Sequence, residues 1–391
     1  MQILMTTQPG HGHLNPMLPI AAALQVAGHH VRFAVAASFI PTIQRHGFEA
    51  VAAGVDYLES QVEDTFPEVA AMSDAERSEW FIADLFGDMA ATQMAADLTE
   101  ICHVWRPDLI VRGAFEFGAC VVAEKFNIPH VAINVGLFHS PQILAGAIAE
   151  QMAFLRMLHG LSAQPALEML YRHLYLSNLP RRFEHPDVML PVGYRPFQPQ
   201  FKAPAQATLP DYIHTLPDQP TVHVTLGTVF NNRPAVYQLI IEALREEPLN
   251  LIVAIGKGQD VTQFRPQPAN VYIENFISHA LLLPYCDLVI GHGGSGTTLH
   301  AMAEGLPQLV VPLSAEQPYV ANRVTDLQVG KALYLPGSFT PEQLTAVMAQ
   351  WPLVTHESVR SSTLELLHNP QYRHNARQIQ QELMNNATPR K

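Results

Sequence analysis

Short apolar runs alternate with helical patterns along the whole chain of 391 residues, and this alternation constrains the fold more than any other sequence feature. Short strands separated by helices are typical of βαβ units in a parallel sheet. The first half is predicted to contain strands at residues 3–5, 30–35, 49–52, 109–112 and 130–134. The second half is predicted to contain strands at residues 221–226, 249–255, 271–274, 287–290, 308–311 and 332–335. Each half is therefore expected to form its own parallel sheet.

A proline-rich stretch separates the two halves. Residues 190–220 contain seven prolines and few periodic apolar residues, a pattern that indicates an extended connector. A chain of this length also exceeds what one hydrophobic core usually serves. We predict an α/β protein of two Rossmann-like domains, residues 1–200 and 201–391, that face each other across a cleft. The C-terminal helix could pack back on the first domain, and the long helical insertions at 57–104 and 140–180 are expected near a site.

The composition limits the partners and the compartment. With 35 acidic against 23 basic residues, the formal net charge is −12, so neither nucleic acid nor an anionic membrane surface is an expected partner. No apolar stretch approaches the roughly 20 residues that span a bilayer, and no signal peptide is visible. Cys102, Cys120 and Cys286 are too scattered for a disulfide framework or a metal site. These features predict a cytoplasmic protein without a metal, either a monomer or a homodimer.

The first predicted strand runs into a loop with the sequence Pro-Gly-His-Gly-His, which ends at His13. Asn15 is expected to cap the following helix, and Gly28 is expected to end it. The loop lies at the carboxyl end of its strand, where parallel sheets bind ligands. An imidazole with a pKa near 6.5 suits a general base at neutral pH. His13 is the candidate for this base, and His11 is its rival.

The strongest local signal is a strand, a glycine-rich turn and a helix between Asp287 and His300. Glycines let a backbone approach a ligand closely, and the free amides at a helix start hold anions in the positive field of the helix dipole. The pattern matches neither a P-loop nor a Gly-x-Gly-x-x-Gly dinucleotide motif. It predicts a pyrophosphate site. The residues expected to form this site are His292, Gly293, Gly294, Ser295, Gly296 and Thr297.

Several separated motifs, in order along nearly the whole chain, resemble those of one enzyme family. They lie at residues 9–16, 224–228, 276–279, 287–300 and 312–317. Together they resemble the GT-B glycosyltransferases of family 1, and the His-Gly-Gly-Ser-Gly-Thr-Thr form is similar to the bacterial branch that acts on natural products. The resemblance implies an inverting, metal-independent hexosyltransferase with His13 as the base. It would need no cofactor beyond its co-substrate, a UDP- or dTDP-sugar, and its acceptor would be a small apolar aglycone.

The resemblance also implies roles for individual residues of the second domain. Phe276 would stack on the pyrimidine base, and the backbone of Ile277 would read the edge of that base. Glu316 and Gln317 would bind hydroxyls of the sugar. The diphosphate would be held by Thr228, His292, Gly294, Ser295, Gly296 and Thr297.

This sequence departs from the family pattern at several positions. Many relatives orient the base histidine with an Asp where this chain has Gly113. Glu116 could replace that Asp, or it could be a carboxylate at a helix start that the dipole favours. His300 stands where many relatives use Glu on the ribose, so the ribose contact is left unassigned. Three further departures bear on base and sugar contacts: Phe276 replaces Trp, His279 replaces Gln and Glu316 replaces Asp.

Two other functions share these features. A nucleotide-sugar 2-epimerase has a similar fold and diphosphate site, but His13 and the Glu316–Gln317 pair favour transfer. A catalytically silent auxiliary that binds a nucleotide sugar is suggested by Gly113, whereas the presence of His13 argues against it.

Overall fold

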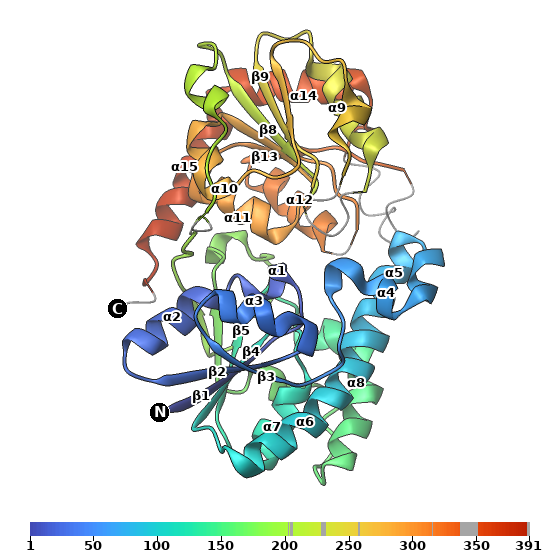
Figure 1. Cartoon of the computed structure of the whole chain (residues 1–391), viewed down its shortest axis with the longest axis vertical. Coiled ribbons are helices and arrows are strands. Elements are labelled where there is room, and N and C mark those ends of the chain that lie inside the picture. The colour runs from blue at the N-terminus through green and yellow to red at the C-terminus, as the bar shows by residue number, and fades with distance from the viewer. Residues whose placement is uncertain are drawn as a thin grey trace. The chain divides into compact units, whose positions relative to one another are not determined.

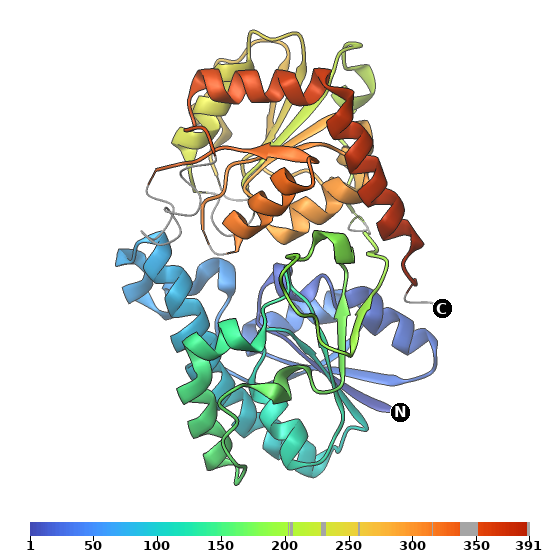
Figure 2. The same cartoon turned by 180° about the vertical axis from the view of Figure 1, so that it is seen from behind.

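The computed structural model describes residues 1–201, 203, 206–227, 232–256, 259–314, 316–336 and 351–388. The chain divides into two compact units (Figures 1 and 2). Unit 1 comprises Met1–Pro199 with the tail Asn386–Lys391, and unit 2 comprises Gln200–Asn385. Each unit contains one parallel sheet flanked by helices.

Unit 1 has a seven-stranded parallel sheet in the order β3-β2-β1-β4-β5-β6-β7. All five strands predicted in the first half are present, and β6 and β7 extend the sheet. The strands are β1 (Gln2–Thr6), β2 (His30–Val35), β3 (Glu49–Ala52), β4 (Leu109–Gly113), β5 (His130–Ile133), β6 (Leu174–Ser177) and β7 (Tyr194–Pro196).

The helices of unit 1 cover both faces of this sheet because strand residues alternate between two cores. Leu4 belongs to the core with α6 and α8, whereas Ile3 and Met5 belong to the core with α2 and α3. The α-helices are α1 (His11–Leu14), α2 (Leu18–Val26), α3 (Ile40–Arg45), α4 (Val62–Thr65), α5 (Asp74–Trp80), α6 (Ala90–Val104), α7 (Gly118–Lys125) and α8 (Pro141–Leu158). Between α5 and α6 lies a π-helix, η4 (Phe81–Met89). The 3₁₀ turns are η1 (Ala37–Phe39), η2 (Glu59–Gln61), η3 (Pro67–Ala71), η5 (Glu168–Tyr171) and η6 (Arg181–Phe183).

The helix after β1 begins earlier than the sequence indicated. A first short helix, α1, starts at His11 with Gly10 as its N-cap, and Asn15 is the C-cap of that helix. The expected cap at Asn15 is therefore wrong, although Gly28 does follow the end of α2 with a φ of 84°. The consequence is that His13 lies on a helical turn and not in an open loop.

Unit 2 has a six-stranded parallel sheet in the order β10-β9-β8-β11-β12-β13. Each predicted strand is present, and the last one begins at Gly330, two residues before the expected position. The strands are β8 (Thr221–Thr225), β9 (Asn250–Ala254), β10 (Val271–Glu274), β11 (Leu288–Gly291), β12 (Gln308–Val310) and β13 (Gly330–Ala332). The helices are η7 (Asp211–Thr215), α9 (Pro234–Leu244), η8 (Val261–Phe264), α10 (His279–Leu282), η9 (Leu283–Tyr285), α11 (Ser295–Ala303), α12 (Gln317–Asp326), α14 (His356–His368) and α15 (Pro370–Asn385).

The C-terminal helix α15 packs within unit 2. Gln380 donates a hydrogen bond of 2.7 Å to the carbonyl of Ala303, at the end of α11. Only the tail beyond this helix belongs to unit 1, where the amide of Gln198 donates to the carbonyl of Ala387. Among the helices that the structure describes, none is both long and apolar enough to cross a membrane.

Both sheets have the strand order of a doubly wound fold, in which the order reverses at one point. The reversal lies between β1 and β4 in unit 1 and between β8 and β11 in unit 2. Ligands of such sheets bind outside the carboxyl ends of the strands at this switch point. In unit 1 these ends lead into the His13 turn and the segment after Gly113, and in unit 2 they lead into Gly227 and the glycine-rich turn.

Candidate active site

His13 is held in an enclosed setting at the switch point of unit 1. Its side chain is 7% exposed, and it meets the rings of Phe86 and Phe115 edge-on, at centroid distances of 5.6 and 6.0 Å. Its Nε2 atom lies 3.4 Å from Oε1 of Glu59, and its Nδ1 atom is buried without a hydrogen-bond partner. The rival His11 is exposed and lies edge-on to Phe39.

Glu116 is fully buried, and its carboxylate accepts hydrogen bonds from backbone amides at the start of α7. It accepts hydrogen bonds from the amides of Gly118 and Ala119, at 3.0 and 3.2 Å, and from the hydroxyl of Thr6 at 3.3 Å. Burial raises the pKa of this carboxyl to about 7, although Arg112 and these hydrogen bonds act in the opposite direction. Of the two interpretations of Glu116, the geometry matches the carboxylate at a helix start and not the partner of His13.

Glu59, the carboxylate that does contact His13, was missed at the sequence level. It lies in η2, inside the segment interpreted as a helical insertion. No local motif surrounds it. Its one indirect sequence signal is Gly10, where any Cβ atom would overlap the Glu59 carboxylate.

The glycine-rich turn of unit 2 joins β11 to α11 as predicted. Gly294 is the N-cap of α11, which starts at Ser295, so the first amides of this nine-residue helix are available at the switch point. A Cβ atom at Gly296 would meet nothing within 4 Å, so the backbone there is open to a ligand. Thr297 is buried on the same first turn. Thr228, also predicted for the diphosphate, lies outside the residues that the structure describes.

His292 is clamped between two glycines. A Cβ atom at Gly227 or at Gly294 would overlap its imidazole ring, and Gly227 has a φ of 80° that itself favours glycine. Burial lowers the pKa of His292 to about 4, so the ring is neutral near pH 7. Its Nδ1 atom is buried without a hydrogen-bond partner.

The two residues predicted to bind the sugar lie beside this turn. Glu316 accepts a hydrogen bond of 3.2 Å from the hydroxyl of Ser295, which links it to the start of α11. Gln317 is buried, and its Oε1 atom accepts from the amides of Leu313 and Ser314, at 2.8 and 3.0 Å. The amide oxygen of Gln317 is therefore occupied in shaping the loop after β12.

The two residues predicted to contact the pyrimidine base of the donor differ in exposure. Phe276 is 47% exposed, whereas the side chain of Ile277 is buried. On α11, the Nδ1 atom of His300 lies 2.9 Å from the carbonyl of Gly296, and the ring centroid of His300 lies 3.6 Å from that of Phe201. The Phe201 contact could not be found from the sequence because this residue lies in the proline-rich connector.

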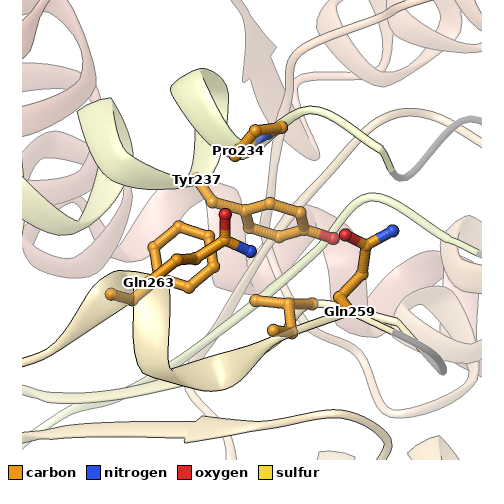
Figure 3. A pocket seen from close by; sticks show the side chains of 6 residues that line it. Pro234, Tyr237, Gln259 and Gln263 are labelled. Carbon is orange, nitrogen blue, oxygen red and sulfur yellow. The ribbon is translucent and has the colours of Figure 1, made fainter.

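A small hollow in unit 2 is a packing feature and not a ligand site (Figure 3). Its side chains, among them Pro234, Gln259 and Gln263, surround Tyr237 and leave no room for a water molecule. The Tyr237 hydroxyl accepts from the amide of Leu226 and donates to the carbonyl of Ala254, which ties the ends of β8 and β9 together. Among the described residues, no group of three or more His, Cys, Asp or Glu side chains could hold a metal ion.

Comparisons with known proteins identify the family. The model of the N-terminal domain of erythromycin biosynthesis protein CIII-like proteins matches residues 22–186, and that of their C-terminal domain matches residues 239–391. The L-demethylnoviosyl transferase of Streptomyces niveus is 30% identical over 371 residues, which cover 91% of this chain and 90% of that protein. This chain is a GT-B glycosyltransferase of family 1.

A second relative and a solved structure also match most of this GT-B glycosyltransferase. The 4'-demethylrebeccamycin synthase of Lentzea aerocolonigenes is 29% identical over 363 residues, 83% of this chain and 85% of its own length. The crystal structure of the glycosyltransferase VinC in complex with dTDP matches with a TM-score of 0.75 at 25% identity, and it covers 100% of this chain and 97% of that one. The predicted family and GT-B fold are therefore confirmed.

Proposed function

We propose that this GT-B glycosyltransferase moves a sugar from a dTDP- or UDP-sugar to a small apolar natural-product acceptor, with inversion and without a metal. The observation that carries the proposal is the pair of switch points: an enclosed histidine in unit 1 and an open helix start behind a glycine-rich turn in unit 2. A base and an anion site are what transfer from a nucleoside diphosphate requires. The dTDP bound to VinC supports a dTDP-sugar donor.

The diphosphate would lie against the first turn of α11. The amides of Ser295, Gly296 and Thr297 carry the partial positive charge of the helix N-terminus, and the open space at Gly296 admits the ligand. Because His292 is neutral near pH 7, it would act as a hydrogen-bonding group and not as a cation. Glu316 would accept from sugar hydroxyls, and the NH₂ group of Gln317 would donate to them, since its oxygen is already occupied.

His13 would take the proton of the acceptor hydroxyl as the acceptor oxygen attacks the anomeric carbon. The bond between that carbon and the diphosphate oxygen breaks, and the nucleoside diphosphate leaves with the electron pair. Attack from the face opposite the leaving group inverts the anomeric centre. Phe115, which is partly buried beside His13, would provide apolar surface for an aglycone.

A mass-spectrometric screen tests this function directly. Purified protein is incubated with dTDP- and UDP-sugars and with polyketide and flavonoid acceptors, in the presence and absence of EDTA. We expect a glycosylated product with the inverted anomeric configuration and no effect of the chelator. Donor binding without a product would indicate an auxiliary protein instead, and a loss of turnover restored by magnesium or manganese would overturn the metal-independent mechanism.

A further inference from the structure

The contact between His13 and Glu59 lies within unit 1 and is largely shielded from water. Nε2 of His13 and Oε1 of Glu59 are 3.4 Å apart, and the two side chains are 7% and 18% exposed. Charges so little exposed interact more strongly than a surface pair, because they are less screened by solvent. A carboxylate in this setting stabilises a protonated imidazole more than a neutral one.

The chain fixes Glu59 in this position through its backbone neighbours. The amide of Glu59 donates to the carbonyl of Pro9 at 3.1 Å, within the segment that leads into the His13 turn. Two residues before Glu59, the hydroxyl of Tyr57 donates to Gln8 at 2.9 Å, and Gln8 donates to the carbonyl of Phe115 at 3.0 Å. The segment with Glu59 is thus hydrogen-bonded to the segment after β1, which is in turn hydrogen-bonded to the segment after β4.

Gly10 leaves the space that the Glu59 carboxylate occupies. A Cβ atom at position 10 would overlap Oε2 and lie 3.2 Å from Cβ of Glu59. Gly10 is not in the left-handed region, so its backbone conformation is open to other residues. A side chain at position 10 would therefore displace the Glu59 carboxylate from its place beside His13.

The other candidate partners of His13 are unsuited to that role. A Cβ atom at Gly113 would lie 3.0 Å from the hydroxyl oxygen of Thr7, which is tight even for a methyl group. The carboxylate of Glu116 is engaged by the amides of Gly118 and Ala119. Within the described part of the chain, Glu59 is the carboxylate that lies within 4 Å of the His13 ring nitrogens.

We propose that Glu59 is the positioning residue of His13, in place of a carboxylate at position 113. This inference rests on the proposed function. Nδ1 of His13 is buried, so Nε2, which lies beside the Glu59 carboxylate, is the nitrogen that would face the acceptor. Nε2 takes the proton of the acceptor hydroxyl, and the Glu59 carboxylate stabilises the imidazolium that forms.

The test compares Glu59→Gln, which keeps the shape and removes the charge, with Glu68→Gln, which removes a charge from an exposed residue of the same insertion. With a hydroxyl acceptor, we expect Glu59→Gln to lower kcat at least about 10-fold, with donor KM and melting temperature nearly unchanged. Glu68→Gln should match the wild type, and Glu59→Asp should recover part of the loss. Wild-type turnover by Glu59→Gln would overturn the proposal.

Two further measurements separate positioning from a structural role. The double variant His13→Ala/Glu59→Gln should be hardly slower than His13→Ala, because groups that act as a unit are non-additive; multiplied losses would overturn the proposal. With nitrophenol acceptors, which ionise without a base at mildly alkaline pH, the loss in Glu59→Gln should shrink, and an equal loss would contradict the inference. Wild-type turnover by His13→Ala would instead overturn the base assignment of the proposed function itself.

Discussion

At the scale of single residues, the buried carboxyl of Glu116 makes stability depend on pH. Its pKa is raised to about 7 in the folded chain, above the ordinary value of 4.5. Between these values the unfolded chain has released the proton while the folded chain retains it, so this group's contribution falls as the pH rises from 4.5 to 7. We expect Glu116→Gln to remove that contribution. The difference in unfolding free energy between wild type and variant, measured in urea, should then change with pH in this window; a constant difference would contradict the prediction.

The assignment of His13 is also tested at this scale. We expect His13→Ala to keep the fold and the affinity for dTDP or UDP while turnover of a hydroxyl acceptor falls by about 10²-fold to 10⁴-fold, the usual contribution of a positioned base. Calorimetry measures the nucleotide affinity, and initial rates measure turnover. His11→Ala is the matched control, since His11 is exposed on the same short helix. An inactive His11→Ala with an active His13→Ala would move the base to position 11.

At the scale of elements, the glycines that start α11 have different tasks. A Cβ atom at Gly294 would overlap the clamped ring of His292, whereas one at Gly296 would meet nothing within 4 Å. We expect Gly294→Ala to lower the unfolding free energy by about 1–3 kcal/mol, the usual cost of overpacking. Gly296→Ala should leave stability unchanged or raise it, since alanine is the better helix former, yet it should weaken dTDP binding. Unchanged nucleotide affinity in Gly296→Ala would remove the diphosphate from this helix start.

At the scale of the whole molecule, buried histidines control acid stability. Burial lowers the pKa of His130 to about 3 and those of His223, His292 and His300 to about 4, and it lowers that of His279 well below 6.5. Below pH 6.5 the unfolded chain binds protons that these folded rings do not, so stability falls as the pH drops from 6.5 towards 4. The opposite contribution of Glu116 involves one proton only.

The predicted loss of stability at acid pH can be measured by urea unfolding. Urea midpoints followed by circular dichroism at pH 7.5, 6 and 5 should fall, and the drop between pH 6 and 5 should be the steeper one. His292→Gln is an informative variant, because a neutral amide removes one of the titrating rings and should reduce the slope. A midpoint that stays constant from pH 7.5 to 5 would show that these rings do not remain neutral in the folded chain.

The sequence by itself determined the features that depend on local pattern. Strand periodicity identified the strands of the second sheet and those of the first sheet except β6 and β7, and the connector near residues 190–220 marked the division into two halves. The glycine-rich turn predicted a helix start at Ser295, because glycine spacing and a strand end are visible within a few residues. The order of separated motifs was enough to identify the family, since those motifs need no three-dimensional information.

Only the tertiary structure decided which side chains meet. Glu59 contacts His13 across a long stretch of chain, the Phe201 ring in the connector lies against the His300 ring, and the Glu116 carboxylate accepts from its own helix. Such contacts depend on how loops pack at the ends of strands, and no periodicity records that packing. The sequence alone does not distinguish Glu116 from Glu59, in a distant insertion, as the carboxylate partner of His13. In the folded chain the buried Glu116 carboxylate accepts hydrogen bonds from nearby donors, and Glu59 is the carboxylate beside His13.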